Sequence, residues 1–416
     1  MGTLWIILSV AFVAAGLVWL GVVALSASAV RLAPLLRAEA EAGAESETGR
    51  PVAADVTVVI AARDEAERIE ETVRRALAQR EVARVVVADD RSSDATPAIL
   101  ERLRAEFAER GEIEGRPRLA VVRIDELPAG WLGKPHALHL ASREAATDWL
   151  LFTDADAHFE PGLVAAALNH VERANAGGGR RVVHLAALPG YEAAGVWGAA
   201  CTLGPYLLFI ATCAGVTLGL PGGVGVGAFN LVRRDAYERV GGHERLAMEV
   251  VDDVKLGILL RRHAGRSRVA MAPELLRIDW VADAGVLSKL LEKNCFAMAH
   301  YSVALATMYI VGAWFCWALG VVSPVVVAMW VFGAAPTYAG AAGVLAGVGF
   351  WGMAPVALLM ARRFGWPALG AALAPLGFPT MPLIMWRSMR VTLGRRGVTW
   401  RGVTYPLGEL RRRQVW

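Results

Sequence analysis

Long apolar runs near both ends of the chain flank a middle part in which short apolar and polar stretches alternate. Residues 4–30 carry no charge and are long enough as a helix to cross a bilayer. Arg31 and Arg37 follow, so the positive-inside rule places the amino terminus outside and the next residues in the cytoplasm. Residues 303–360 and 366–386 are apolar again. The pattern predicts a membrane protein with a soluble part between its membrane segments.

The middle part predicts alternating strands and helices. Short apolar runs predict strands, and apolar residues at helical spacing predict the helices between them. The strands are expected at 56–62, 82–90, 118–124 and 148–156, and the helices at 64–79, 92–110 and 135–146. Such alternation predicts an α/β fold with a mostly parallel sheet and helices on both faces. In these sheets, ligands bind beyond the carboxyl ends of the strands.

Two pairs of acidic residues stand at predicted strand ends. Asp89 and Asp90 end the second strand, while Asp154 and Asp156 end the fourth. Residues i and i+2 of a strand point the same way, so Asp154 and Asp156 repel each other unless a cation lies between them. Carboxylates suit Mg²⁺ or Mn²⁺. A solvated turn before Pro161 is the alternative, and the shared position of both pairs at the ligand-binding edge favours a site.

Three further polar positions have a structural and a functional interpretation. Asp94 fits a helix cap. Lys134, in "GWLGKPHAL", is either a solvated lysine or a phosphate ligand at a helix start. Asp252 and Asp253, in "EVVDDVKLG", are either first-turn acids that suit the helix dipole or the place of a general base. The first predicted βα turn, "IAARDEAERI", has no GxGxxG, which counts against a dinucleotide-binding oxidoreductase, and the sequence has no GxxxxGK[ST], which counts against a P-loop protein.

The uncharged segment 193–223 is long enough to span a membrane. A single crossing would place Asp154 and Asp253 on opposite sides, so the segment is expected to lie in the interface, to dip in and return, or to be a buried helix. We favour interfacial helices, broken at Gly204-Pro205 and at Pro221-Gly222. At least two spans are expected in 303–360. A further simple span over 366–386 would put the Arg-rich tail outside, against the positive-inside rule, so the number of crossings stays open.

Composition supports a membrane-associated protein. The chain has 416 residues, of which 55% are hydrophobic and 20% charged, and its mean hydropathy is +0.42. The basic tail fits an anionic cytoplasmic lipid surface, and no nucleic-acid-binding motif accompanies it. The four cysteines form no CxxC pair, so we expect them to be packing residues rather than disulfide or zinc ligands.

Six segments, taken together and in order, resemble the membrane-anchored family 2 glycosyltransferases, which have the GT-A fold. The resemblance runs from about residue 56 to residue 299. The segments are "VVIAARDEAERI", "VVVADDRSSDAT", "GKPHAL", "TDADAHF", "GVGAFNLVRRDAYERVGGH" and "VVDDVKLG". They are similar, respectively, to the family's nucleotide-pocket turn, its DDxSxD element, its donor-side GKxxAL, its DxD motif, its acceptor-side segment and its EDxxL motif, with Asp252 in place of Glu.

The resemblance implies a role for each matching residue. Asp89 and Asp90 would contact uridine in a pocket lined by Arg63 and Glu65, and Lys134 would lie on the donor side. Asp154 and Asp156 would hold Mg²⁺ or Mn²⁺ on the diphosphate. Asp253 would be the base that deprotonates an acceptor hydroxyl, which then displaces the nucleotide in one inverting step.

One departure narrows the expected activity. Processive synthases of this family carry a QxxRW or RxxRW motif after the base, whereas the corresponding region here reads "LEKNCFAMAHYS". We therefore expect a non-processive enzyme. The tail "GVTWRGVTYPL" is similar to the hopanoid-associated and carotenoid glycosyltransferase subgroup.

The expected protein is thus an inverting, metal-dependent hexosyltransferase in the inner membrane of the cell, multi-pass, with a cytoplasmic catalytic domain. It would transfer a sugar from a UDP-sugar to a membrane lipid hydroxyl. A polyprenyl-phosphate glycosyltransferase and a non-catalytic membrane scaffold are the alternatives. The expected regions are a transmembrane helix, a linker, a nucleotide-sugar-binding part, the apolar helices, an acceptor and base part, a membrane region and a basic tail, at 1–30, 31–55, 56–192, 193–223, 224–301, 302–389 and 390–416.

Overall fold

The computed structural model describes residues 2–38, 55–108, 112–113 and 116–415. The chain forms two compact units. One, the helical unit, contains residues 1–32, 192–215 and 280–411; the other, the sheet unit, contains residues 33–191, 216–279 and 412–416. Residues 39–54 of the predicted linker lie outside the described residues.

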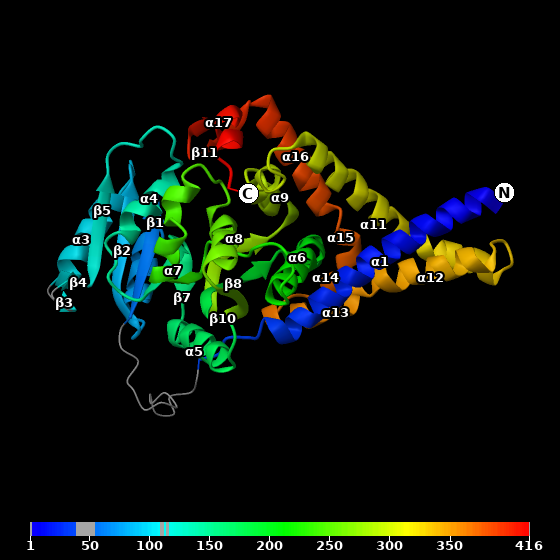
Figure 1. Cartoon of the computed structure of the whole chain (residues 1–416), viewed down its shortest axis with the longest axis horizontal. Helices are drawn as coiled ribbons and strands as arrows, with labels where there is room; N and C mark the ends of the chain where they lie inside the picture. Colours follow the sequence, from blue (N-terminus) through cyan, green and yellow to red (C-terminus); the bar gives the residue numbers. More distant parts are fainter. Residues whose placement is uncertain (1, 39–54, 109–111, 114–115, 416) are drawn as a thin grey trace. The chain divides into compact units, whose positions relative to one another are not determined.

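An eight-stranded sheet organises the sheet unit (Figure 1). Its strand order is β5-β2-β1-β6-β9-β8-β10-β7, and β5, β2, β1 and β6 run parallel. Strand β9 pairs antiparallel with both β6 and β8. The strands are β1 Val56–Ala62, β2 Val82–Asp90, β5 Leu119–Ile124, β6 Trp149–Asp154, β7 Ala157–Phe159, β8 Val182–Ala193, β9 Asn230–Arg233 and β10 Arg266–Ala282.

Helices cover both faces of the parallel strands. The apolar side chains of β1 point alternately to the two faces and are buried on each. Val59 and Leu150 lie in one core cluster with Leu138 of α4 and Leu256 of α8, whereas Val58 points the opposite way and is also fully buried. The expected α/β architecture is confirmed. The helices of this unit are α2 Ile69–Leu77, α3 Thr96–Ala108, α4 Gly133–Ser142, α5 Leu163–Ala176, α7 Arg234–Arg239 and α8 Asp252–His263, with a 3₁₀ turn Gly242–Leu246 and a small ladder of β3 Glu112–Ile113 and β4 Arg116–Pro117.

The helical unit contains the apolar segments. Among the residues that the structure describes, four helical stretches are long and apolar enough to cross a membrane: Gly2–Ala29, Gly195–Thr217, Val303–Val331 and Thr337–Phe364. Its elements are α1 Gly2–Leu32, α6 Gly195–Thr217, α9 Ala284–Leu291, α10 Cys295–Met298, α11 Val303–Val331, α12 Thr337–Trp351, α13 Met353–Phe364, α14 Ala368–Ala372, α15 Ala374–Gly377, α16 Thr380–Gly394, β11 Gly397–Trp400, β12 Val403–Pro406 and α17 Leu407–Arg412.

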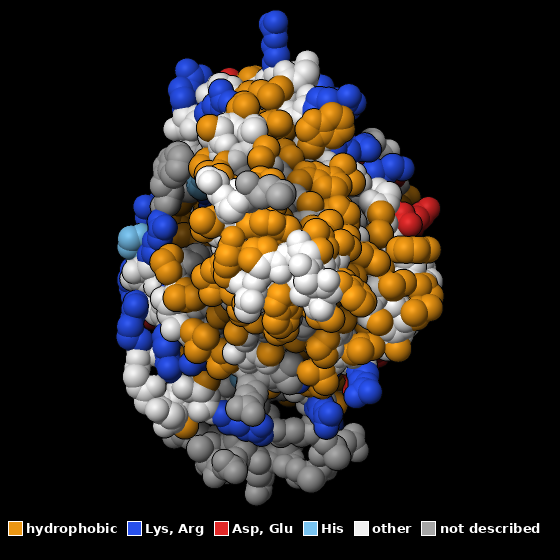
Figure 2. Space-filling model, turned by 90° about the vertical axis from the view of Figure 1, so that its right-hand side faces the viewer, with side chains coloured by type: hydrophobic (Ala, Val, Ile, Leu, Met, Phe, Trp, Pro, Cys, Tyr) orange, Lys and Arg blue, Asp and Glu red, His pale blue; other side chains and the backbone are white. Residues whose placement is uncertain are grey.

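Apolar side chains cover a broad surface of α1, α11 and α12 (Figure 2). Exposed members include Ile7 on α1, Val311 and Phe315 on α11, and Val348 on α12. An exposed apolar surface of this kind marks a membrane or protein contact, and the length of these helices favours lipid.

Helix α6 differs from the expected broken segment. It is one continuous helix that contains Pro205, although a break at Gly204-Pro205 was expected from the proline. Gly204 packs so closely against α15 that an added Cβ would lie 2.6 Å from the Ala374 carbonyl oxygen. This tertiary packing accounts for the continuity of the helix across the proline.

Candidate active site

Strand register brings the two acidic pairs to one edge of the sheet. Ala62 at the end of β1 pairs with Asp89 of β2, and Ala61 pairs with Asp154 of β6. Neighbouring strands lie about 4.8 Å apart, so the pairs flank the end of β1. The expectation that both pairs share the carboxyl edge of the parallel strands agrees with this register.

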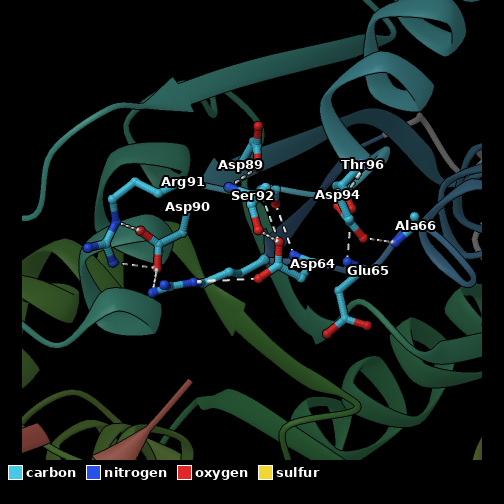
Figure 3. A network of polar contacts seen from close by, with 11 residues as sticks. Asp64, Glu65, Ala66, Asp89, Asp90, Arg91, Ser92, Asp94 and Thr96 are labelled. Atoms are coloured by element: carbon cyan, nitrogen blue, oxygen red, sulfur yellow. Dashed lines mark hydrogen bonds and ion pairs between the residues drawn. The ribbon is translucent and has the colours of Figure 1, made fainter. Parts of the chain in front are cut away.

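The turn after β1 is fastened to the turn after β2 by hydrogen bonds (Figure 3). Backbone N–H groups of Asp64, Glu65 and Ala66 donate to the side chains of Ser92, Thr96 and Asp94, respectively, over distances of 2.8–3.0 Å. Asp94 also accepts from the Thr96 N–H, which is the capping role expected of it. Because Asp64 has a positive φ of 54°, the network holds a turn that the backbone would not favour by itself.

Asp90 lies between two arginines. Its carboxylate accepts two hydrogen bonds from the Arg91 guanidinium, at 2.8 and 3.1 Å, and Arg63 lies 4.0 Å away. The side chain is only 6% exposed. Asp89 is also buried and accepts from the Ser92 N–H at 3.3 Å. The residues expected to contact the nucleoside therefore lie together, and Arg91 lies beside them.

The first turn of α4 contacts both acidic pairs. A Cβ at Gly133 would lie 2.3 Å from Asp90 Oδ2, so only glycine lets the backbone approach this carboxylate. The next residue, Lys134, places its ammonium nitrogen 2.5 Å from Asp154 Oδ1. Burial by itself would lower the pKa of Lys134, but the carboxylates of Asp154, Asp252 and Asp253 raise that pKa above its usual value. Lys134 is therefore a charged partner of the acidic cluster.

Asp154 and Asp156 form a site with excess negative charge. Burial, followed by the nearby carboxylates of Asp154 and Glu65, raises the pKa of Asp156 to about 6. A divalent cation would relieve this repulsion, and carboxylate oxygens are the donors that Mg²⁺ and Mn²⁺ prefer. Among the described residues, no group of three or more His, Cys, Asp or Glu could hold a metal ion. Two carboxylates fit a cation whose other ligands are phosphate and water.

Asp253 lies in the first turn of α8, beside Lys134. Burial and the adjacent Asp252 carboxylate raise the pKa of Asp253 to about 6. Its Oδ1 accepts from the Val254 N–H at 2.8 Å. Both acids line a small cavity together with Lys134, Leu138, Phe152, Thr153, Gly227, Asn230, His243 and Leu256. The cavity thus joins the predicted base to the predicted donor-side lysine.

Alternate glycines connect α8 to the end of β6. An added Cβ would lie 2.2 Å from Ile258 Cγ1 at Gly223, 1.9 Å from the Asp253 carbonyl oxygen at Gly225, and 2.4 Å from Asp154 Oδ2 at Gly227. Alternate residues of an extended chain share a face, so this face of the 223–227 segment must carry no side chains. We call Gly223, Gly225 and Gly227 the glycine stripe.

A buried histidine holds the end of the glycine stripe. His184 of β8 lies 3.1 Å from Asn230 Oδ1 through Nε2, and 3.0 Å from Ser267 Oγ through Nδ1. Asn230 Oδ1 also accepts the Val226 N–H at 3.1 Å. Burial lowers the pKa of His184 to about 4, so the ring is neutral at physiological pH and donates through Nε2 to Asn230.

The structure also shows the contacts of His158 and of several residues that were not predicted from the sequence. His158, two residues after Asp156 in the sequence, contacts Asp279 at 3.1 Å and Glu71 at 3.7 Å. Sequence reasoning did not single out Arg91, the glycine stripe, His184 or His243. The period of two in "GVGVG" is the signal that indicates the stripe; the histidines have no local signal.

Comparison with known proteins connects this site to a family. Residues 57–241 match the model of the family described as glycosyl transferase family 2. No curated protein matches the chain. Among solved structures, the chain is similar to mannosyltransferase PcManGT from Pyrobaculum calidifontis in complex with GDP-Man and Mn²⁺, with 20% identity, a TM-score of 0.46, and 92% of this chain and 98% of that chain covered.

A second solved structure is glucosyl-3-phosphoglycerate synthase from Mycobacterium tuberculosis, in complex with Mn²⁺, UDP and glucosyl-3-phosphoglycerate. It shares 16% identity and a TM-score of 0.36, with 62% of this chain and 86% of that chain covered. The family match and the sheet give the sheet unit a GT-A-like fold. The segment that matches glycosyl transferase family 2 contains every predicted nucleotide and metal residue and ends before Asp253.

Proposed function

We propose that the protein is an inverting, non-processive glycosyltransferase that moves a sugar from a UDP-sugar to a hydroxyl of a membrane lipid. One observation carries the proposal: the first turn of α4 packs Gly133 on Asp90 and pairs Lys134 with Asp154. The predicted nucleoside pocket, the predicted cation site and the predicted base are thereby brought around one lysine.

The nucleoside would bind at the Asp90 pocket. Asp89 and Asp90 would accept hydrogen bonds from the base or ribose, while Arg63 and Glu65 would line the same pocket. Asp90 is already held by Arg91 and Arg63, so its carboxylate is oriented before a ligand arrives. Such preorganisation reduces the entropy lost on binding.

The diphosphate would lie between Lys134 and the two carboxylates of β6. Asp154 and Asp156 would hold Mg²⁺ or Mn²⁺, which would neutralise charge that develops on the leaving diphosphate. Lys134 would supply a second positive charge from the start of α4.

Asp253 would accept the proton of the attacking hydroxyl. A pKa of about 6 leaves this carboxylate ionised at pH 7 and basic enough for proton transfer. Because the hydroxyl attacks opposite the leaving diphosphate, the anomeric configuration inverts. The long apolar helices favour a lipid as the carrier of that hydroxyl, at the cytoplasmic face of the membrane.

UDP binding by calorimetry on the detergent-purified full chain tests the proposal. Binding should require Mn²⁺, disappear in EDTA, weaken at least about tenfold in Asp156→Ala, and exceed the binding of GDP. The control, Asp235→Ala, removes an exposed aspartate of α7 and should bind as the wild type does. UDP binding that is unchanged in EDTA, or absent altogether, would contradict the proposed site.

A further inference from the structure

A buried chain of polar side chains joins the end of α4 to the start of α8. Ser142 Oγ lies 3.1 Å from Tyr237 Oη, which lies 2.8 Å from His243 Nδ1. His243 Nε2 lies 3.7 Å from Asp252 Oδ2. All four residues are buried, and the roles assigned above to Lys134 and Asp253 do not use them.

Asp252 and Asp253 are neighbours with different surroundings. The Asp252 side chain is 5% exposed and faces His243, whereas Asp253 is partly exposed and bonds the N–H of Val254. A buried carboxylate needs a compensating donor. The orientation of Asp252 therefore fixes the first turn of α8, and with it the direction of Asp253.

Hydrogen-bond accounting assigns the protons of this chain. Ser142 donates to the His139 carbonyl oxygen at 2.8 Å, and Tyr237 Oη accepts the backbone N–H of His243 at 3.0 Å. Burial raises the pKa of Tyr237 to about 12, so the phenol keeps its proton. When the phenol donates to His243 Nδ1, the neutral ring carries its proton on Nε2 and directs it toward Asp252.

The backbone before His243 is built around the same tyrosine. Gly242 has a φ of +50°, and an added Cβ would lie 2.6 Å from Tyr237 Cζ. The His243 ring packs against Phe152 with centroids 4.8 Å apart. The segment "GGH" thus places the His243 imidazole in a buried position between β6, α7 and α8.

We propose that His243 is a positioning residue for the proton transfer assigned to Asp253: its Nε2 faces the Asp252 carboxylate at 3.7 Å, and Tyr237 donates to its Nδ1 at 2.8 Å. The inference rests on the proposed function.

Three variants separate positioning from packing. His243→Phe keeps an aromatic ring against Phe152 but removes both nitrogens, and His243→Gln keeps an N–H donor. Asp252→Asn removes the charge that the imidazole faces. His263→Phe is the matched control, because His263 is exposed at the far end of α8.

The first measurement is a double-mutant cycle in thermal unfolding of the full chain with His243→Phe and Asp252→Asn. The two losses should not be additive, because the double variant breaks one shared contact. Additive losses would show that the pair does not interact and would overturn the proposal, whatever the enzyme does.

The second measurement is UDP release from UDP-glucose, with UDP-galactose and GDP-mannose as alternative donors and water as the acceptor. In His243→Phe, kcat should fall about 10- to 100-fold while KM for the donor and the calorimetric UDP affinity stay within about threefold. His243→Gln should recover most of the lost kcat, and His263→Phe should resemble the wild type.

The outcomes separate the two proposals. A wild type that neither binds UDP nor releases it contradicts the proposed function, and the positioning role falls with it even if the unfolding cycle shows coupling. A wild type that is active but whose His243→Phe variant loses UDP affinity as much as kcat, without recovery in His243→Gln, contradicts positioning alone.

Discussion

At the scale of single residues, Asp253 carries the proton transfer in the proposed reaction. Its pKa of about 6 makes it an ionised base above that pH, so Asp253→Asn should lower kcat by about 10²–10⁴. Because the substitution leaves the predicted metal and nucleoside residues intact, Mn²⁺-dependent UDP binding should persist. The check is UDP release beside calorimetry of the same preparation. Full activity in Asp253→Asn would favour the polyprenyl-phosphate alternative, in which the attacking phosphate oxygen needs no strong base.

His184 should make the stability of the sheet unit depend on pH. Its folded pKa of about 4 is below the usual value of 6.5. The stabilisation is therefore fully present above about pH 6.5 and is lost as the pH falls toward 4, because the unfolded chain binds the proton first. The contribution of His184 to unfolding free energy should fall by about 2 kcal/mol between pH 7.5 and pH 5.

Denaturant unfolding of the wild type and of His184→Gln at these two pH values checks this expectation. Other groups titrate in both proteins, so the difference between the two pH dependences isolates His184. The variant should lose less stability on acidification than the wild type. His263→Gln, which changes an exposed histidine, should lose as much as the wild type; equal losses in all three proteins would contradict the assignment.

At the scale of elements, the glycine stripe sets the distance between the 223–227 segment and α8. In Gly225→Ala the new methyl group would meet the Asp253 carbonyl oxygen, which is backbone and cannot rotate away. The start of α8 must move, so we expect a cost of about 1–3 kcal/mol in stability and a larger loss of kcat than of UDP affinity.

Gly177→Ala provides the matched control for Gly225→Ala. Gly177 also belongs to the sheet unit, has a φ of −70°, and its added Cβ would have its nearest contact at an ordinary 3.9 Å. Thermal unfolding and UDP release should be close to the wild type in this variant. If Gly225→Ala behaved in the same way, the stripe would not constrain the base.

Local pattern explains why some of these elements were predictable. The apolar runs of β2 and β6 end at acids, so the position of these acids at the carboxyl edge follows from the βα alternation alone. The start of α8 at Asp252 also follows from a local helix signal. By contrast, the contacts of His184 with Asn230 and of His243 with Asp252 depend on tertiary packing. No period in the sequence connects those residues, and the return of β9 beside β6 has no local signal.

At the scale of the whole molecule, strand pairing constrains the path of the chain through a membrane. Strands β8 and β9, which precede and follow α6, pair with each other. In a membrane, both ends of α6 would therefore lie on the same side as the sheet, and α6 would make no net crossing although its length would allow one. Its most apolar window is 72% buried in the protein, against 17% for α11, which agrees with a packed rather than a lipid-exposed helix.

The carboxyl-terminal segment gives a second constraint. The Val415 N–H donates to Glu249, and Lys255 Nζ donates to the Val415 carbonyl oxygen at 2.5 Å. Glu249 and Lys255 are both buried. Because these contacts lie within the sheet unit, residue 415 must be on the same side of the membrane as Asp253. The chain between residues 279 and 412 must then cross an even number of times.

Crossings by α1, by α11 and by α12 with α13 would satisfy both constraints, with no crossing by the proline-interrupted helices α14 to α16. This arrangement would also keep Arg362, Arg363 and the Arg-rich tail on the cytoplasmic side, in agreement with the positive-inside rule. We predict that epitope tags at the amino terminus and at Gly333 are accessible to antibody in intact spheroplasts. Tags at Gly365 and at the carboxyl terminus should become accessible only after permeabilisation.

Gly333 and Gly365 suit such insertions, because an added Cβ at either would meet no atom within 4 Å. UDP binding by each tagged protein shows that the fold survives. An exposed tag at Gly365 would mean that α12 and α13 do not complete the return crossing. A carboxyl-terminal tag accessible in intact spheroplasts would be more damaging, since it would place Val415 across the membrane from Glu249 and Lys255. The buried Glu249 and Lys255 side chains would then lose their hydrogen bonds with the backbone of Val415.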